Sequence, residues 1–236
     1  MGRGPSIEGR KNAEDARRGK IFTKLIREIT VASRNGGDPA TNARLRAGID
    51  KALSANMTKD TIERAVRRGS GAEGADDMHE LRYEGYGPSG VALIIDAMTD
   101  NAQRTVADVR HALAKHGGNL GTSGSVAFQF HRLGQIVIDT SGPGSEDKLL
   151  EAALDAGADD VQTESGKSTV LCSPENFEAV KKALLAAGFQ PLSADVVMRP
   201  ENRVAVSEEV AETLRDLIDW LEELDDVQEV YHNAAL

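Results

Sequence analysis

The sequence predicts an α+β protein of three domains, in which an all-helical N-terminal domain precedes two ferredoxin-like α/β domains, one inserted in the other. Three observations predict this fold. Residues 1–70 show only helical periodicity, and the Gly- and Ala-rich residues 69–77 are typical of a linker. The rest alternates strand and helix patterns in the split βαβ order. The expected domains are residues 1–77, residues 78–131 with 200–236, and the inserted residues 132–199.

Three helices are expected in the N-terminal domain. The first runs from about residue 11 to 34, where residues 35–39 (NGGDP) end it with Gly and then Pro. A second helix fits residues 41–56. Thr58 is expected to cap a third, which ends near Arg68 before Gly69.

The α/β part is expected to contain alternating strands and helices. Before the insertion we expect strands at 81–86, 91–98 and 126–130 and a helix at 102–116. In the insertion we expect strands at 134–140, 160–164, 168–172 and 189–197 and helices at 146–156 and 174–187. A C-terminal helix at 207–224 and a strand at 227–232 then complete the first α/β domain.

Composition excludes several classes of protein. With 236 residues, 40% hydrophobic and 28% charged, the chain has a globular composition and room for two or three domains. Its single cysteine, Cys172, cannot form an internal disulfide, which fits a reducing compartment. No apolar stretch approaches the roughly 20 residues of a membrane span, and no signal peptide is present. We therefore expect a cytoplasmic protein with no membrane partner.

Charge is distributed unevenly along the chain. The net charge is −10, yet residues 1–70 contain 16 of the 28 Lys and Arg and only 8 of the 38 Asp and Glu. Such asymmetry predicts that the basic part binds a polyanion such as nucleic acid. The alternative is that the basic and acidic parts of the chain attract one another.

The first helix aligns its cations. At about 100° per residue, five of them fall within one arc of about 100°, opposite Phe22, Leu25 and Ile29. We call these five the basic row: Arg17, Lys20, Lys24, Arg27 and Arg34. Val31 is the one apolar residue in this arc. Aligned like charges are slightly unfavourable unless phosphates neutralise them, so the row favours nucleic-acid binding.

The next two helices add further candidate phosphate ligands. Most are arginines, whose planar guanidinium suits bidentate phosphate contacts. They are Arg44, Arg46, Lys51, Lys59, Arg64, Arg67 and Arg68. One alternative is an ordinary solvated basic face. Another is a membrane-surface helix, which is disfavoured because the apolar residues are needed for the helical core.

Two glycine-rich segments, residues 83–90 and 117–124, are weaker candidates for nucleic-acid contacts. Exposed amides in such loops bind phosphate, and tyrosines stack on bases. The candidate side chains are Tyr83, Tyr86 and Asn119, with Asn101 and Arg104 where a strand meets a helix. Neither segment has the context of a dinucleotide-binding or P-loop motif. The alternative is turn chemistry, with the tyrosines in the core.

No catalytic, metal-binding or cofactor-binding pattern is recognisable. The five histidines lack metal-site spacing, and His111 and His116 lie five apart, which a helix does not place on one face. Cys172 lies in an expected strand without a basic neighbour, which indicates a buried thiol. The carboxylates at 222–226 are expected to be solvated. We therefore expect a non-enzymatic protein with no small-molecule substrate, metal or cofactor.

Several segments resemble the YebC/PmpR family, relatives of the mitochondrial translational activator of cytochrome oxidase. They are residues 20–28 (KIFTKLIRE), 44–53 (RLRAGIDKAL), 83–88 (YEGYGP), 117–126 (GGNLGTSGSV) and 226–233 (DVQEVYHN). The resemblance implies a three-domain cytosolic protein that regulates through nucleic acid and leaves open which one, although many members are described as DNA-binding transcriptional regulators. Mitochondrial relatives activate translation, and some bacterial relatives act at ribosomes. Many members open with Met-Ala-Gly-His-Ser-Lys-Trp, and residues 1–8 (MGRGPSIE) lack this His, Lys and Trp.

Three functions follow as hypotheses. The first is a transcriptional regulator that binds duplex DNA through residues 1–70. The second is a translation factor that binds ribosomal or transfer RNA, because no helix shows a clear base-reading pattern. The third is a protein–protein adaptor whose acidic α/β domains bind a basic partner.

Overall fold

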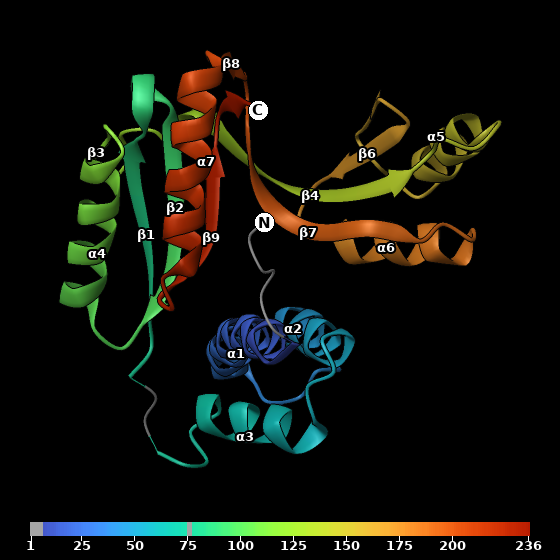
Figure 1. Cartoon of the computed structure of the whole chain (residues 1–236). Coiled ribbons are helices and arrows are strands. Elements are labelled where there is room, and N and C mark those ends of the chain that lie inside the picture. Colours follow the sequence, from blue (N-terminus) through green and yellow to red (C-terminus); the bar gives the residue numbers. More distant parts are fainter. Residues whose placement is uncertain (1–6, 75–76) are drawn as a thin grey trace. The chain divides into compact units, whose positions relative to one another are not determined.

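The structure is a computed structural model that describes residues 7–74 and 77–236 (Figure 1). The opening of the chain, which departs from the family's usual opening, lies largely in residues 1–6, outside the described residues. Ala75 and Asp76 of the expected linker also lie outside them. The chain divides into two compact units. The first comprises residues up to Ser123 with Val206–Val230, and the second comprises Gly124–Ala205 with Tyr231–Leu236.

Three helices begin the first unit: α1 (Ile7–Ala32), α2 (Ala43–Ser54) and α3 (Lys59–Gly69), with a 3₁₀ turn at Ser33–Asn35. The predicted cap at Thr58 is confirmed, because its hydroxyl accepts a hydrogen bond of 3.3 Å from Thr61 N. Asn42 caps α2 in the same way, accepting from Leu45 N at 3.0 Å. A buried apolar cluster joins the helices: Ile29, Ala32, Leu45, Ala52, Met57, Ile62 and Ala65.

The helices α1 and α3 approach each other closely at Gly69. A Cβ built there would lie 1.9 Å from the Thr30 carbonyl oxygen and 2.9 Å from Ser33 Cβ. Only glycine therefore fits this position. Because Gly69 has no side chain, the last turn of α3 packs directly against the backbone of α1.

A four-stranded sheet forms the rest of the first unit. Its order is β3-β1-β2-β9, with β1 (His79–Tyr86), β2 (Ala92–Thr99), β3 (Asn119–Leu120) and β9 (Val227–His232). The last two residues of β9 belong to the second unit. Two helices, α4 (Ala102–Lys115) and α7 (Glu208–Glu223), lie together over this sheet (Figure 1). The C-terminal helix and strand thus return to the sheet that β1 and β2 begin.

The single tryptophan, Trp220, lies on α7 beside two histidines. Its ring centroid is 5.9 Å from that of His111 on α4 and 5.4 Å from that of His116, which follows the helix. Five positions along a helix would place the two histidines on different faces. His116 follows the last residue of α4, Lys115, so both rings can lie beside Trp220.

The predicted strand at 126–130 is wrong. Residues Ala127–Gln129 form a 3₁₀ turn (η3). The segment that pairs with β1 is instead β3, through Asn119 and Leu120. Glycines explain the difference, because they let this segment run close to β1. A Cβ on Gly118 would lie 2.1 Å from the Tyr86 carbonyl oxygen, and one on Gly85 would lie 2.8 Å from the Asn119 carbonyl oxygen.

The second unit contains a split βαβ arrangement. Its elements are β4 (Phe130–Asp139), α5 (Ser145–Asp155), β5 (Asp160–Glu164), β6 (Lys167–Cys172), α6 (Phe177–Ala186) and β7 (Pro191–Pro200). The sheet order is β5-β6-β4-β7, and all three pairings are antiparallel. Ile136, Val170, Leu149 and Leu184 are among the core residues between the sheet and its helices. A short parallel pair, β8 (Val204–Ala205) with β10 (Ala234–Ala235), completes the unit.

The α+β class is therefore confirmed, while the three domain boundaries at 77, 131 and 199 stay predictions. Within residues 7–74 and 77–236, no helix has the length and apolarity needed to cross a membrane.

Candidate nucleic-acid interface

Phe22, Leu25 and Ile29 on the apolar face of α1 pack as the helical periodicity predicts, whereas Ile21 on that face is exposed. Much of the opposite face is not open to solvent. Val31, which falls among the cations on the helical wheel, is only 3% exposed. The cations in the middle of this face contact the acidic end of α7 and the residues after it. We call residues 222–226 the acidic turn; it contains Glu222, Glu223, Asp225 and Asp226.

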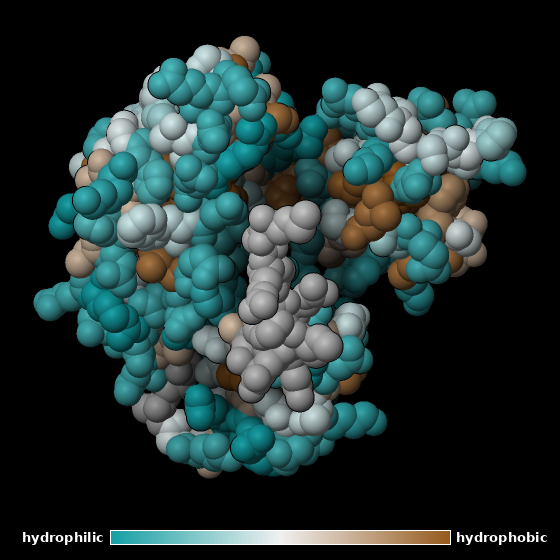
Figure 2. Space-filling view, viewed as in Figure 1, coloured by the Kyte–Doolittle hydropathy of each residue, from teal (hydrophilic) through white to brown (hydrophobic). Residues whose placement is uncertain are grey.

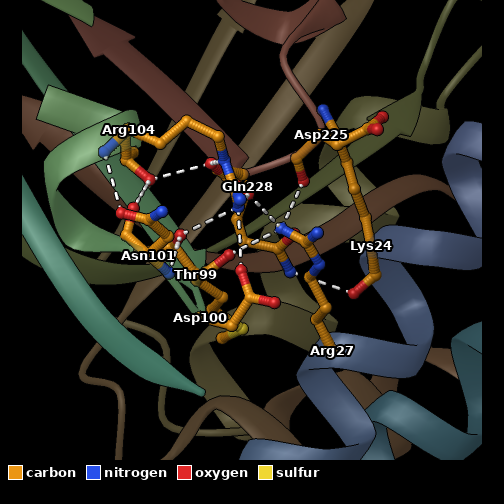
Figure 3. Close-up of polar contacts among 11 residues, drawn as sticks. Lys24, Arg27, Thr99, Asp100, Asn101, Arg104, Asp225 and Gln228 are labelled. Carbon is orange, nitrogen blue, oxygen red and sulfur yellow. Dashed lines mark hydrogen bonds and ion pairs between the residues drawn. The ribbon is translucent and has the colours of Figure 1, made fainter. Parts of the chain in front are cut away.

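Three members of the basic row contact this acidic turn, and Figure 3 labels two of them, Lys24 and Arg27, near Asp225. Lys20 forms an ion pair with Glu223. The ammonium of Lys24 donates to the Glu222 carbonyl oxygen at 2.8 Å. Arg27 donates through Nη1 to the carbonyl oxygens of Met98 at 2.7 Å and Asp225 at 2.8 Å. The middle of the row is therefore docked on the protein's own oxygen atoms.

Asp226 is the centre of this contact. It is 5% exposed and accepts from Arg27 Nη1 at 2.9 Å, from Thr105 Oγ1 at 2.8 Å, and from both Nε (3.0 Å) and Nη2 (2.9 Å) of Arg104. Burial by itself raises the pKa of this carboxyl, and the hydrogen bonds from Arg104, Arg27 and Thr105 outweigh that effect and lower it. Asp226 is thus a buried carboxylate that stays ionised between two guanidinium groups.

The contact is less favourable at Lys24. Burial lowers the pKa of its ammonium, and the neighbouring charge of Lys20 lowers it further. The nearby Glu222 raises it without cancelling the effect of burial. Lys24 therefore loses hydration in this arrangement.

The two ends of the basic row have different surroundings. At the start, residues 13–19 are all exposed, including Arg17. At the other end, Arg34 is also exposed and donates through Nη2 to the Met78 carbonyl oxygen. The open, N-terminal part of the row is thus Arg17, and Lys20 stands at the boundary with 36% of its side chain exposed.

Other predicted phosphate ligands have partners within the first unit. Arg44 on α2 bridges Glu28, at 2.8 Å from Nε, and Glu80, at 3.0 Å from Nη1. Burial lowers the pKa of Arg44, while its hydrogen bonds with Glu80 and Glu28 raise it above the ordinary value. Arg46 donates to the Pro39 carbonyl oxygen at 2.9 Å. Arg67 pairs with Glu73 at 3.1 Å.

The remaining cations of α2 and α3 are on the exposed surface. Arg64 pairs with Asp60 one turn away at 3.2 Å, and 60% of its side chain is exposed. Lys51, Lys59 and Arg68 are also exposed. The visible surface of α3 is largely hydrophilic (Figure 2). These side chains are the accessible part of the predicted site.

Arg18 is an accessible cation that the helical wheel missed. It falls on the side of α1 assigned to the core, yet residues 13–19 are all exposed because this part of α1 extends past its partner helices. No periodicity in the sequence signals where a helix leaves the core. The local run of Arg17 and Arg18 was the only available sign.

The loop candidates have structural roles. Asn101 caps α4 by accepting from Arg104 N at 3.0 Å, and Arg104 pairs with Asp226 and Asp100. Tyr83 is half-buried, and burial followed by the charge of Asp226 raises its pKa. Tyr86 is likewise half-buried, and its strand partner is the exposed Asn119. No observation places these residues in a binding site.

A groove of about 630 Å³ lies at the junction of α1 with the acidic turn. Its lining mixes cations with carboxylates: Lys20, Arg27, Asp100, Arg104, Asp108 and residues 223–226. Among the described residues, no three His, Cys, Asp or Glu side chains are grouped as metal ligands. Cys172 is fully buried, and burial raises the pKa of its thiol.

Comparisons with known proteins cover nearly the whole chain. A family model described as the TACO1/YebC protein N-terminal domain matches residues 4–72, and one described as the TACO1/YebC second and third domain matches residues 78–234. A probable transcriptional regulatory protein of Xanthomonas campestris is 57% identical over 99% of this chain and 97% of its own length. One from Stenotrophomonas maltophilia is 55% identical over 100% and 98%.

A solved structure is also similar. It is the crystal structure of a conserved hypothetical protein, Aq1575, from Aquifex aeolicus. The TM-score is 0.84 and the sequence identity 44%, over 94% of this chain and 91% of that one. The similarity therefore extends through sequence and fold together.

Proposed function

Because the chain belongs to the TACO1/YebC family, we propose that it is a non-enzymatic, cytoplasmic regulator that binds nucleic acid through its helical domain. The first candidate ligand is duplex DNA, as befits a transcriptional regulator. Relatives that match the whole chain are named probable transcriptional regulatory proteins, which supports this choice.

The single observation that supports the proposal best is the exposed set of cations on the helical domain. Arg17 and Arg18 project from the exposed start of α1, and Lys51, Lys59, Arg64 and Arg68 are exposed on α2 and α3. Exposed Lys and Arg side chains bind phosphates and release the counterions that surround a nucleic acid. The docked members of the basic row, Lys20, Lys24 and Arg27, join this surface only when they leave the acidic turn.

RNA, on the ribosome or as transfer RNA, is the second candidate, and the helix N-termini favour it. Base reading in a DNA groove uses side chains at the start of a recognition helix. At the start of α2, Asn42 is 8% exposed and donates to the carbonyl oxygens of Ala32 and Gly36, each at 2.8 Å. Asn42 is therefore not available to contact bases. The binding surface then consists of the exposed cations, which contact phosphates and do not read bases.

The test compares a duplex DNA with an RNA hairpin of equal phosphate number over a salt series. Binding through about four to six phosphates gives a slope of log affinity against log salt of roughly −4 to −5 for duplex DNA. Replacing Arg17, Arg18 and Arg68 together by Glu is expected to reduce affinity by at least tenfold. The matched control replaces Lys115, Lys148 and Lys182, which are exposed outside the helical domain, by Glu. Equal losses in both triple variants would contradict this site.

Absence of binding to both nucleic acids at low salt would overturn the proposed function. The remaining hypothesis would then be the adaptor, in which the helical domain only docks on the protein's own acidic residues.

A further inference from the structure

The acidic turn at the end of α7 has an unusual electrostatic composition. The last turn of α7 contains no basic residue, and four carboxylates lie at 222–226. The C-terminal end of a helix already has partial negative charge, so these carboxylates are unfavourable there without cations nearby. Lys20, Lys24 and Arg27 of α1 supply that positive charge.

The turn presents its oxygen atoms to α1 in the way that a phosphate backbone would. Lys20 meets the Glu223 carboxylate and Lys24 the Glu222 carbonyl oxygen, while Arg27 meets both the Asp225 carbonyl oxygen and the Asp226 carboxylate. Phosphate oxygens of a nucleic acid likewise accept from Lys and Arg side chains, so the turn and a polyanion suit the same cations.

We propose that the acidic turn is an internal competitor of nucleic acid, so that residues 222–226 and a polyanion bind the same three cations of α1 in alternation. This regulation rests on the proposed function, since it concerns the same basic row. In the docked state Lys20, Lys24 and Arg27 contact the acidic turn. In the undocked state they face the nucleic acid together with Arg17.

The contact is weakest where a polyanion would first arrive. The side chains of Lys20 and Glu223 are 36% and 69% exposed, and exposed ion pairs of this kind add little stability. Lys24 loses hydration when docked, and this burial lowers the pKa of its ammonium. Lys20 and Glu223 also line the groove at this junction. Exchange can therefore begin at the exposed, N-terminal side and proceed toward Arg27.

Undocking does not leave a buried charge unpaired. When Arg27 leaves, Asp226 still accepts two hydrogen bonds from the guanidinium of Arg104 and one from Thr105 Oγ1. Removal of a partner from a buried ion pair is usually costly because the other charge remains unsatisfied. Here the second arginine and the hydroxyl reduce that cost, so both states are accessible.

The first experiment measures affinity for a duplex DNA of about 20 base pairs by fluorescence anisotropy at one salt concentration. The test variant combines Glu223→Gln with Asp225→Asn, which weakens the acidic turn. The control combines Glu212→Gln with Asp216→Asn, two exposed carboxylates on the same helix. If about one molecule in ten is undocked, the test variant gains up to roughly tenfold in affinity, because apparent affinity is proportional to the competent fraction. The control, with the same change in charge, gains less than about twofold.

The second experiment measures distance in the full chain. Spin labels on Glu14→Cys in α1 and Glu209→Cys in α7 report on their separation; both positions are exposed, and the native Cys172 is fully buried. Adding the duplex is expected to lengthen the distance in the labelled protein. The salt that abolishes DNA binding should abolish this change as well.

The outcomes separate the two proposals. A lengthened distance with a selective gain in the test variant supports internal competition. DNA binding with an unchanged distance and equal gains in both variants overturns it and leaves the proposed function standing. Failure of the wild type and both variants to bind DNA or an RNA hairpin overturns the proposed function, and internal competition with it.

Discussion

Arg27 on α1 and Asp226, immediately before β9, form an ion pair of 2.9 Å although they are 199 positions apart in the sequence. Their side chains are only 16% and 7% exposed. This pair joins the helical domain to the sheet of the first unit. The Asp226 carboxylate is therefore expected to affect the stability of the fold, its dependence on pH and the access of a ligand to Arg27.

Replacing Asp226 by Asn is expected to destabilise the protein by about 2 to 4 kcal/mol, because two guanidinium groups lose their shared carboxylate. Urea unfolding followed by circular dichroism measures the change. Asp216→Asn is the control, since that carboxylate is exposed on α7 and lies outside the acidic turn. A loss of stability as large in the control as at position 226 would contradict the role assigned to the Asp226 carboxylate.

The same carboxylate predicts a dependence of stability on pH. Its pKa in the folded protein lies below the ordinary value of 3.8, so it binds a proton less readily when folded than when unfolded. Its stabilisation is complete above the unfolded pKa and is lost as pH falls through the folded pKa. The difference in unfolding free energy between the wild type and Asp226→Asn should therefore shrink from about pH 5 to about pH 2. A constant difference over this range would mean that the ionised form is not what stabilises the fold.

Arg44 is expected to contribute to stability and not to nucleic-acid binding. Its guanidinium bridges Glu28 on α1 and Glu80 on β1. Arg44→Gln leaves those two carboxylates without their shared cation and is expected to cost about 1 kcal/mol, the upper range for exposed ion pairs. Affinity for DNA should fall by less than about twofold, against at least tenfold for the triple variant at Arg17, Arg18 and Arg68. A large loss of DNA affinity in Arg44→Gln would show that Arg44 belongs to the binding surface.

Two glycines are expected to respond oppositely to Ala. Gly69→Ala places a Cβ 1.9 Å from the Thr30 carbonyl oxygen, so α3 must shift and the helical domain loses more than about 2 kcal/mol. Gly19→Ala meets nothing within 4 Å in the exposed part of α1 and should stabilise it by about 0.5 to 1 kcal/mol. Thermal unfolding of both variants measures the two signs, and a neutral Gly69→Ala would contradict the close approach of α1 and α3.

Cys172 is expected to react with a thiol reagent only on unfolding. It is fully buried, and burial together with the charge of Asp159 raises its pKa, which decreases the reactive thiolate at neutral pH. The rate of labelling in native buffer should be at least about a hundredfold slower than in denaturant. Equal rates would show that the core of the second unit opens readily.

Local patterns allowed most of the secondary structure to be predicted. Thr58 begins α3, residues 160–164 form β5, and residues 227–232 form β9, as expected. The strand expected at 126–130 is absent, because Ala127–Gln129 form a 3₁₀ turn. The backbone approach that Gly85 and Gly118 permit is a tertiary property, and it placed the pairing at 119–120 instead.

The candidate site was harder to predict for the same reason. The helical wheel gives the direction of the basic row, but not what lies opposite it. Residues that contact the row, such as Glu223 and Asp226, are about 200 positions away, and their charges suggested only a solvated helix end. The alternative that the basic and acidic parts attract one another was the closer description of Lys20, Lys24 and Arg27. Arg17 and the cations of α3 remain exposed, as a binding surface requires.

The position of Trp220 gives the protein an optical signal of its own. Because it is the only tryptophan and lies three residues before Glu223, its emission originates next to the acidic turn. The rings of His111 and His116 lie beside the indole, so a change in their packing alters its surroundings. Light from one native side chain can thus follow events at the end of α7 in real time, in unlabelled protein.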